Sequence, residues 1–162
     1  ASCGDYATNC VNCGIARRWW PKGDILSATL GTPMIRSDWK SYSFSFTPLV
    51  DTKITLNLTG WRGEKTAYDD VSATGCTIVN GGFESSGGWD DVTVDPEMSK
   101  HGLILPPYGI LEATTLERVV ATSGSKVALA NAYLVVSQRE IAVKKGVSVR
   151  ISLKARPYVP GL

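Results

Sequence analysis

A chain of 162 residues is long enough to form one domain with its own hydrophobic core. Its 17 lysines and arginines nearly balance its 15 aspartates and glutamates, and the basic residues are scattered, so nucleic acid is not expected as a partner. No apolar run approaches the roughly 18 to 20 residues that cross a bilayer, so no membrane span is expected.

Residues 1–23 lack an alternating pattern, and they hold three of the four cysteines, so we predict a disulfide-pinned loop there. Two disulfides would staple this region in an oxidising compartment, which indicates a secreted protein. Three pairings stay open. The alternative is a zinc site, suggested by the spacing of two of the cysteines, although such sites normally bring a second Cys-x2-Cys pair. The cysteines are Cys3, Cys10, Cys13 and Cys76.

Several segments alternate strictly between apolar and polar residues, which is typical of half-buried strands. Many short strands separated by glycine and proline turns predict a single all-β domain, an antiparallel β-sandwich of the jelly-roll type spanning residues 1–162. Residues 112–122 are open to a short helix, although β-branched residues are dense there. The regular strands are 41–47, 53–59 and 147–155, and less regular ones are 24–30, 67–73, 77–79, 92–94, 126–130 and 139–143.

Two groups of motifs carry a family resemblance. Asn80-Gly-Gly-Phe-Glu84, followed by Gly88-Trp89, resembles the opening of a carbohydrate-binding module of the galactose-binding-domain-like jelly-roll superfamily. The stretch from Trp39 to the Tyr68-Asp-Asp-Val-Ser72 motif is similar to the closing half of the same module. The resemblance covers residues 24–158 and implies a non-catalytic module that binds an extracellular glycan.

The two halves stand in reversed order. Residues 24–75 match the closing half and residues 76–162 the opening half, so the chain is expected to be a circular permutant in which the strand around Val71 lies beside the strand around Phe83. The first half would then complete its own sandwich or that of a neighbouring copy, because an unpaired edge strand is a template for another chain. A third explanation is a junction between two modules of a tandem array.

The resemblance also implies a structural calcium ion. Asp69 and Asp70 on the closing strand and Glu84 on the opening strand would meet there, and calcium prefers carboxylate oxygens. Asp69 has the parity of the apolar Val71, which favours it over Asp70 as the ligand, because an unpaired buried carboxylate is costly. The alternative is that Glu84 caps a turn and both aspartates are solvated.

Aromatic side chains outside the strands are the candidates for stacking on a sugar ring. They are Trp19, Trp20, Trp61 and Tyr108, whereas the resemblance gives Trp39 and Trp89 a structural role. Trp19 and Trp20 could instead anchor the cysteine-rich loop.

Asn57 begins the only N-glycosylation sequon, and its parity opposite Leu56 and Leu58 places it on the solvent face, where it could also be an ordinary exposed asparagine. The sole histidine, His101, has no nucleophile motif near it, and the acidic residues Asp90, Asp91, Asp95 and Glu97 lie in a turn-rich segment, so no enzyme is expected. The favoured hypothesis is a secreted glycan-binding sandwich without catalysis. The alternative is a self-assembling subunit of an extracellular filament or sheath, linked head to tail by strand or half-domain exchange.

Overall fold

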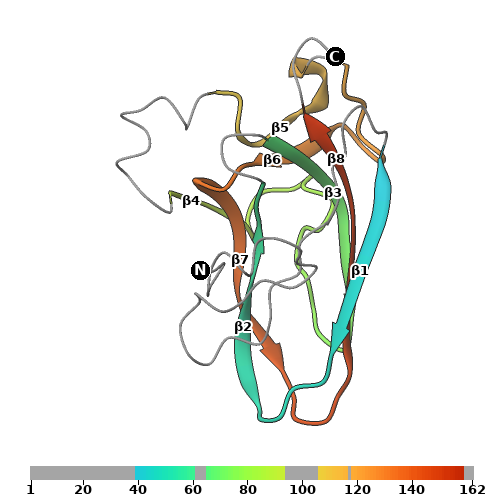
Figure 1. Cartoon of the computed structure of the whole chain (residues 1–162), viewed down its shortest axis with the longest axis vertical. Coiled ribbons are helices and arrows are strands. Elements are labelled where there is room, and N and C mark those ends of the chain that lie inside the picture. The colour runs from blue at the N-terminus through green and yellow to red at the C-terminus, as the bar shows by residue number, and fades with distance from the viewer. Residues whose placement is uncertain (1–38, 61–64, 94–105, 117, 159–162) are drawn as a thin grey trace, which may run out of the picture. The chain divides into compact units, whose positions relative to one another are not determined.

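The computed structural model describes residues 39–60, 65–93, 106–116 and 118–158. These residues form two antiparallel sheets, one of five strands in the order β1-β8-β3-β6-β5 and one of three in the order β2-β7-β4. Figure 1 shows β2 and β7 opposite β3, β8 and β1. The predicted all-β, sandwich-like class is therefore confirmed. The strands are β1 (Lys40–Phe46), β2 (Thr52–Leu58), β3 (Lys65–Thr74), β4 (Asp90–Thr93), β5 (Gly109–Glu112), β6 (Lys126–Ala130), β7 (Leu134–Val143) and β8 (Val149–Tyr158).

The regular strands form where alternation predicted them, because each buries one face. In β8 the side chains of Val149, Ile151 and Leu153 are buried, while those between them stay in contact with solvent. Serine hydroxyls line the exposed face of β1, and its aromatic rings are half-buried on the other face. Alternation of this kind places the apolar side chains of both sheets in one shared core.

One strand and half of another were not predicted, and three predicted elements have other outcomes. β5 and the first half of β7 carry no alternating signal. Residues 134–138 of β7 are all buried, so they have no solvent-exposed face. Residues 77–79 were predicted to be a strand, which is wrong, because they form no strand. The described residues of segment 112–122 contain one turn of 3-10 helix, η1 (Ala113–Thr115). The predicted strand 24–30 lies outside the described residues.

Strands of the first half of the chain pair with strands of the second half. β1 pairs with β8, from Lys40 opposite Ala155 onwards, and β2 pairs with β7, from Thr52 opposite Val143. β3 lies between β6 and β8. Among the described strands, β1, β2 and β3 make no pair with one another. Residues 40–74 therefore have no sheet of their own and pack on residues 126–158 of the same chain.

The segment between β3 and β4 corrects the expectation of an opening strand. Residues 75–89 form turns and bends, and Asn80 and Phe83 have the left-handed φ values 54° and 64°, which a strand does not accommodate. The Asn80 side chain stabilises the loop instead: its Nδ2 donates to the carbonyls of Ser85 at 2.7 Å and Gly87 at 3.0 Å. One point of contact with β3 exists, where Val71 N donates to Gly81 O at 2.9 Å.

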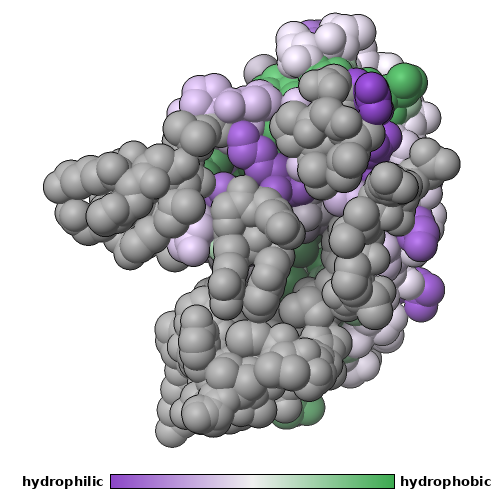
Figure 2. All heavy atoms as spheres, turned by 45° about the horizontal axis from the view of Figure 1, so that its top comes forward, coloured by the Kyte–Doolittle hydropathy of each residue, from purple (hydrophilic) through white to green (hydrophobic). Residues whose placement is uncertain are grey.

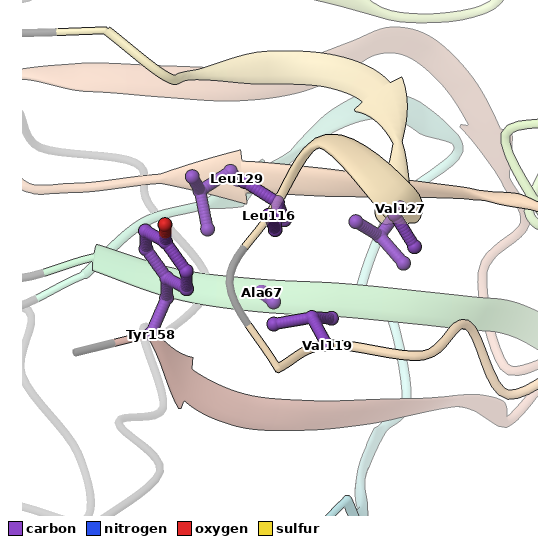
Figure 3. Packing of buried hydrophobic residues seen from close by; sticks show 7 residues of the cluster. Ala67, Leu116, Val119, Val127, Leu129 and Tyr158 are labelled. Carbon is purple, nitrogen blue, oxygen red and sulfur yellow. The ribbon is translucent and has the colours of Figure 1, made fainter. Parts of the chain in front are cut away.

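A second cluster of buried side chains lies on the face of the five-stranded sheet that carries Ala67. Figure 3 shows Leu116 and Val119 packed over Ala67, Val127 and Leu129. Trp39 closes one side of the cluster, and its Nε1 donates to Val120 O at 2.7 Å. The segment from η1 to Thr122 thus covers β3 and β6 from the side opposite β2 and β7.

Candidate functional site

An exposed tyrosine stands where the two sheets approach one another. Tyr108 directly precedes β5, follows a cis bond between Pro106 and Pro107, and is 39% exposed. The next residue, Gly109, pairs with Leu129 of β6, so the backbone that carries the ring is part of the five-stranded sheet. The ring is therefore presented to solvent from a fixed position.

An acidic side chain from the other sheet approaches the residue that follows this tyrosine. Gly109 has a φ of +82°, and a Cβ added to it would lie 2.7 Å from Asp91 Oδ2. Asp91 belongs to β4, so this contact joins the edges of the two sheets. Burial, and then the charge of Asp90, raises the pKa of the Asp91 carboxyl. The Asp91 carboxylate thus lies against Gly109, the residue that follows Tyr108 in the chain.

A lysine contacts the same corner from β3. Lys65 Nζ donates to Pro107 O at 2.8 Å, and burial lowers the pKa of this ammonium group. We call Lys65, Asp91 and Tyr108 the Tyr108 cluster. It combines an aromatic face, a carboxylate and an ammonium group, and such a set can hold a polar ring by stacking and charged hydrogen bonds.

The three predicted calcium ligands all contact one loop, residues 122–126. Asp69 is fully buried, as its apolar parity predicted, but the burial comes from this loop. Its Oδ2 accepts from Thr122 N at 2.9 Å and Thr122 Oγ1 at 3.0 Å, and its Oδ1 accepts from Asp70 N at 2.8 Å. Desolvation outweighs these hydrogen bonds and raises the pKa of the Asp69 carboxyl.

Asp70 is half-exposed beside Asp69 because the register shifts here and Asp70 has a φ of 50°. It accepts from Ser123 Oγ at 2.5 Å and Thr122 Oγ1 at 2.6 Å, and Lys154 Nζ lies 3.4 Å away. Desolvation alone would raise the pKa of Asp70, but these hydrogen bonds and the Lys154 charge lower it.

Glu84 contacts the far end of the same loop. Its Oε2 accepts from Lys126 N at 2.7 Å and from Ser125 N at 3.0 Å, and these bonds lower the pKa of its carboxyl. The carboxylates of Asp69, Asp70 and Glu84 are the donor type that calcium prefers. However, N–H groups of the loop point at the same oxygens, and no three acidic, histidine or cysteine side chains gather around one point in the described parts of the chain. As arranged, the three carboxylates accept hydrogen bonds from this loop.

The remaining predicted site residues fall into two groups. Trp19, Trp20, Trp61, Cys3, Cys10 and Cys13 lie outside the described residues, whereas Cys76 is described and carries a free thiol whose pKa burial raises. Asn57 is exposed on β2, as expected for a glycosylation acceptor, and its Oδ1 accepts from Ser137 Oγ at 2.6 Å. Trp89 packs at 5.2 Å between ring centroids on the fully buried Phe83, which is the structural role expected for it.

Sequence reasoning missed Lys65 and Asp91. Asp91 was assigned to solvated loop charges, and Lys65 precedes the alternating part of β3. They contact Pro107 and Gly109, the residues on either side of Tyr108 in the chain, only because β3, β4 and β5 come together in the fold, and no local spacing encodes that. The glycine at position 109 is the local signal in the sequence, because its left-handed φ and the close approach of Asp91 both favour a residue without a Cβ.

On the face shown in Figure 2, the hydrophobic side chains of the described residues form only small separate areas. No helix long and apolar enough to cross a membrane occurs in the described ranges. Comparison of the chain with protein-family models, with curated proteins and with solved structures found no match.

Proposed function

We propose that the chain is a non-catalytic, extracellular β-sandwich that binds a glycan at the Tyr108 cluster. The observation that carries the proposal is the exposed Tyr108 followed by Gly109, against which the Asp91 carboxylate lies. Sugars are held in water by an aromatic ring against their apolar face and by a few charged or polar groups that orient their hydroxyls. Lys65, which contacts Pro107, and Asp91, which lies against Gly109, would supply such groups.

The acidic residues of β4 favour binding over hydrolysis. Asp90 and Asp91 are consecutive in a strand, so their side chains point to opposite faces. Asp90 forms an exposed ion pair with Arg139, at 3.2 Å. Two carboxylates must flank one glycosidic bond for glycoside hydrolysis, and this pair does not converge in that way. Trp19, Trp20 and Trp61 enter the proposal as further stacking residues.

Substitution of Tyr108 tests the proposal. In affinity electrophoresis against a panel of soluble polysaccharides, we expect Tyr108→Ala to weaken retention by about tenfold, because the stacking surface is lost. Tyr108→Phe keeps the ring and should stay within about threefold of the wild type. Tyr108 is 39% exposed, so the melting temperature of each variant is measured alongside, to separate lost retention from lost stability. Equal retention of the alanine variant and the wild type on every polysaccharide that the wild type binds would reject the Tyr108 cluster as the glycan site.

Calcium enters the proposal as a structural ion at loop 122–126, held by Asp69, Asp70 and Glu84. What supports it is that all three carboxylates contact this loop, although its N–H groups would have to turn away. Millimolar calcium is then expected to raise the melting temperature of the wild type and to leave Asp69→Asn unchanged. An identical melting temperature with calcium and with a chelator would leave the hydrogen bonds as the only role of these carboxylates.

A second candidate function is self-assembly into an extracellular filament or sheath. The observation that favours it is the pairing of β1, β2 and β3 with strands of the second half alone. A neighbouring copy offers the same β6, β7 and β8, so exchange of residues 40–74 between chains would preserve every strand pairing while linking protomers.

A further inference from the structure

Two adjacent turns at one end of the sandwich present aliphatic side chains to solvent. One turn joins β1 to β2 and carries Leu49 and Val50, which are 85% and 60% exposed; the other joins β7 to β8 and carries Val147, which is 45% exposed. The two turns lie side by side at the lower end of Figure 1. We call residues 47–51 and 144–148 together the apolar tip.

Hydrogen bonds hold the two turns against each other. Gly146 N donates to Pro48 O at 3.0 Å, and Lys145 N donates to Asp51 Oδ1 at 2.8 Å. Within the second turn, Val147 N donates to Lys144 O at 3.1 Å. Pro48 is buried, so the backbone beneath Leu49 is anchored while the side chain projects outward. The exposure of the apolar tip is therefore built into the contact between the turns.

The charged side chains around the apolar tip leave it positive. Lys144 and Lys145 are exposed, and within the described part of the chain neither ammonium group has a carboxylate partner. The Asp51 carboxylate accepts a backbone N–H. Among the described residues nearby, Lys53 and Glu140 form an ion pair, at 3.3 Å. An anionic partner would thus meet two lysines beside the aliphatic side chains.

The size and charge of the apolar tip select its partner. A specific protein interface takes about 20 to 30 residues from each side, more than the two short turns contain, and a symmetric contact with a second copy would bring Lys144 and Lys145 against their own counterparts. A glycan would need an aromatic face. A lipid surface requires no matching shape: aliphatic side chains enter the boundary of the acyl chains, and lysines contact the phosphates. We propose that the apolar tip docks the chain onto an anionic phospholipid bilayer.

Sedimentation with vesicles tests this docking on the full chain. The wild type should bind phosphatidylserine–phosphatidylcholine vesicles and bind pure phosphatidylcholine vesicles at least about tenfold more weakly. The double variant Leu49→Ser, Val50→Ser should lose at least about tenfold in affinity for the mixed vesicles, because the inserting side chains are removed. Lys144→Gln, Lys145→Gln should lose the part of the binding that salt screens. The matched control is Val120→Ser, which alters a residue that is 77% exposed elsewhere and should bind as the wild type does.

Three results would overturn the proposal. One is recovery of the wild type wholly in the supernatant with mixed vesicles, and another is a loss of binding by Val120→Ser as severe as that of the tip variant. Equilibrium sedimentation could also show a wild-type dimer that the tip variant abolishes, which would make the apolar tip an interface between copies. Circular dichroism and the melting temperature verify that each variant is folded. Unchanged glycan retention by the tip variant separates this membrane docking from glycan binding at the Tyr108 cluster.

Discussion

Asp69 and Asp70 are neighbours in β3, yet the pKa values of their carboxyl groups shift in opposite directions. Both accept from the Thr122 hydroxyl, which has one proton to donate, at 3.0 Å and 2.6 Å. Asp69 is fully buried, so desolvation raises its pKa, whereas the partly exposed Asp70 has Ser123 and Lys154 to favour its charged form. At neutral pH Asp69 therefore lowers the stability of the fold slightly, and Asp70 raises it.

The pH dependence of stability is predicted from these shifts. The lowered pKa values of Glu84 and Asp70 mean that their stabilisation is present above the unfolded values, 4.5 and 3.8, and is lost as the pH falls through the folded ones. The raised pKa of Asp69 acts in the opposite direction. We expect the melting temperature of Glu84→Gln to fall less than that of the wild type when the pH is lowered from about 6 to about 3, because the charge of Glu84 no longer contributes.

Differential scanning fluorimetry over this pH range measures the effect. Glu112→Gln is the matched control, since it neutralises an exposed glutamate of β5, and it should reproduce the wild-type curve. Superimposable curves for Glu84→Gln and the wild type would contradict the role assigned to the bonds from Ser125 and Lys126.

At the scale of elements, the turn segment 75–89 is held in place by β3 and β7. The amide of Gln138 is buried and bonds both the N–H and the carbonyl of Val79, each at 2.8 Å, as a neighbouring strand would do. Val71 N donates to Gly81 O on the other side. The segment therefore joins the two halves of the chain through contacts with both sheets.

A pair of adjacent glycines tests that placement. A Cβ on Gly81 would lie 1.8 Å from Val71 O, whereas a Cβ on Gly82 would meet nothing within 4 Å. We expect Gly81→Ala to lower the free energy of unfolding by about 2 kcal/mol or more, because the backbone of β3 or of the turn must shift. Gly82→Ala should change it by less than about 0.5 kcal/mol. Urea unfolding measures both, and equal values for the two variants would argue against the close approach at Val71.

The strands that could be predicted from the sequence are those with one solvent face. The serines of β1 and the alternation of β2 and β8 locate these elements without further information. β7 was found only in its second half, because residues 134–138 are buried throughout and lose the period of two. The turn at Asn80 was predicted to be a strand, since its left-handed φ depends on bonds to Ser85 and Gly87 that an apolar–polar pattern does not encode.

At the scale of the whole molecule, the sandwich depends on pairing between the two halves of the chain. The burial of Asp69 could be predicted from one strand, and so could the exposure of Tyr108 beside two prolines. The approach of Asp91 to Gly109 could not, because it arises from the order of strands in two separate sheets. The Tyr108 cluster thus arises from the topology and not from any local motif.

Cross-linking of β1 to β8 distinguishes a closed monomer from exchange between chains. Ser43 and Ser152 are directly opposite each other in the register, so the double variant Ser43→Cys, Ser152→Cys places two thiols across the pair. We expect oxidation of the double variant to yield a compact monomer on a non-reducing gel. Wild-type protein oxidised in parallel is the control for the native cysteines. A ladder of multimers specific to the double variant would instead support the filament hypothesis.

The order of strands also determines when this protein can fold. Lys40 pairs with Ala155 and Thr52 with Val143, so a ribosome releases β1, β2 and β3 long before their partners exist. Non-local pairing of this kind slows folding and leaves apolar strands exposed in the nascent chain. β3 has no neighbour on either side until β6 has emerged, and the five-stranded sheet closes only when synthesis passes Tyr158. Premature termination before β8 would therefore release an aggregation-prone polypeptide instead of a smaller folded one.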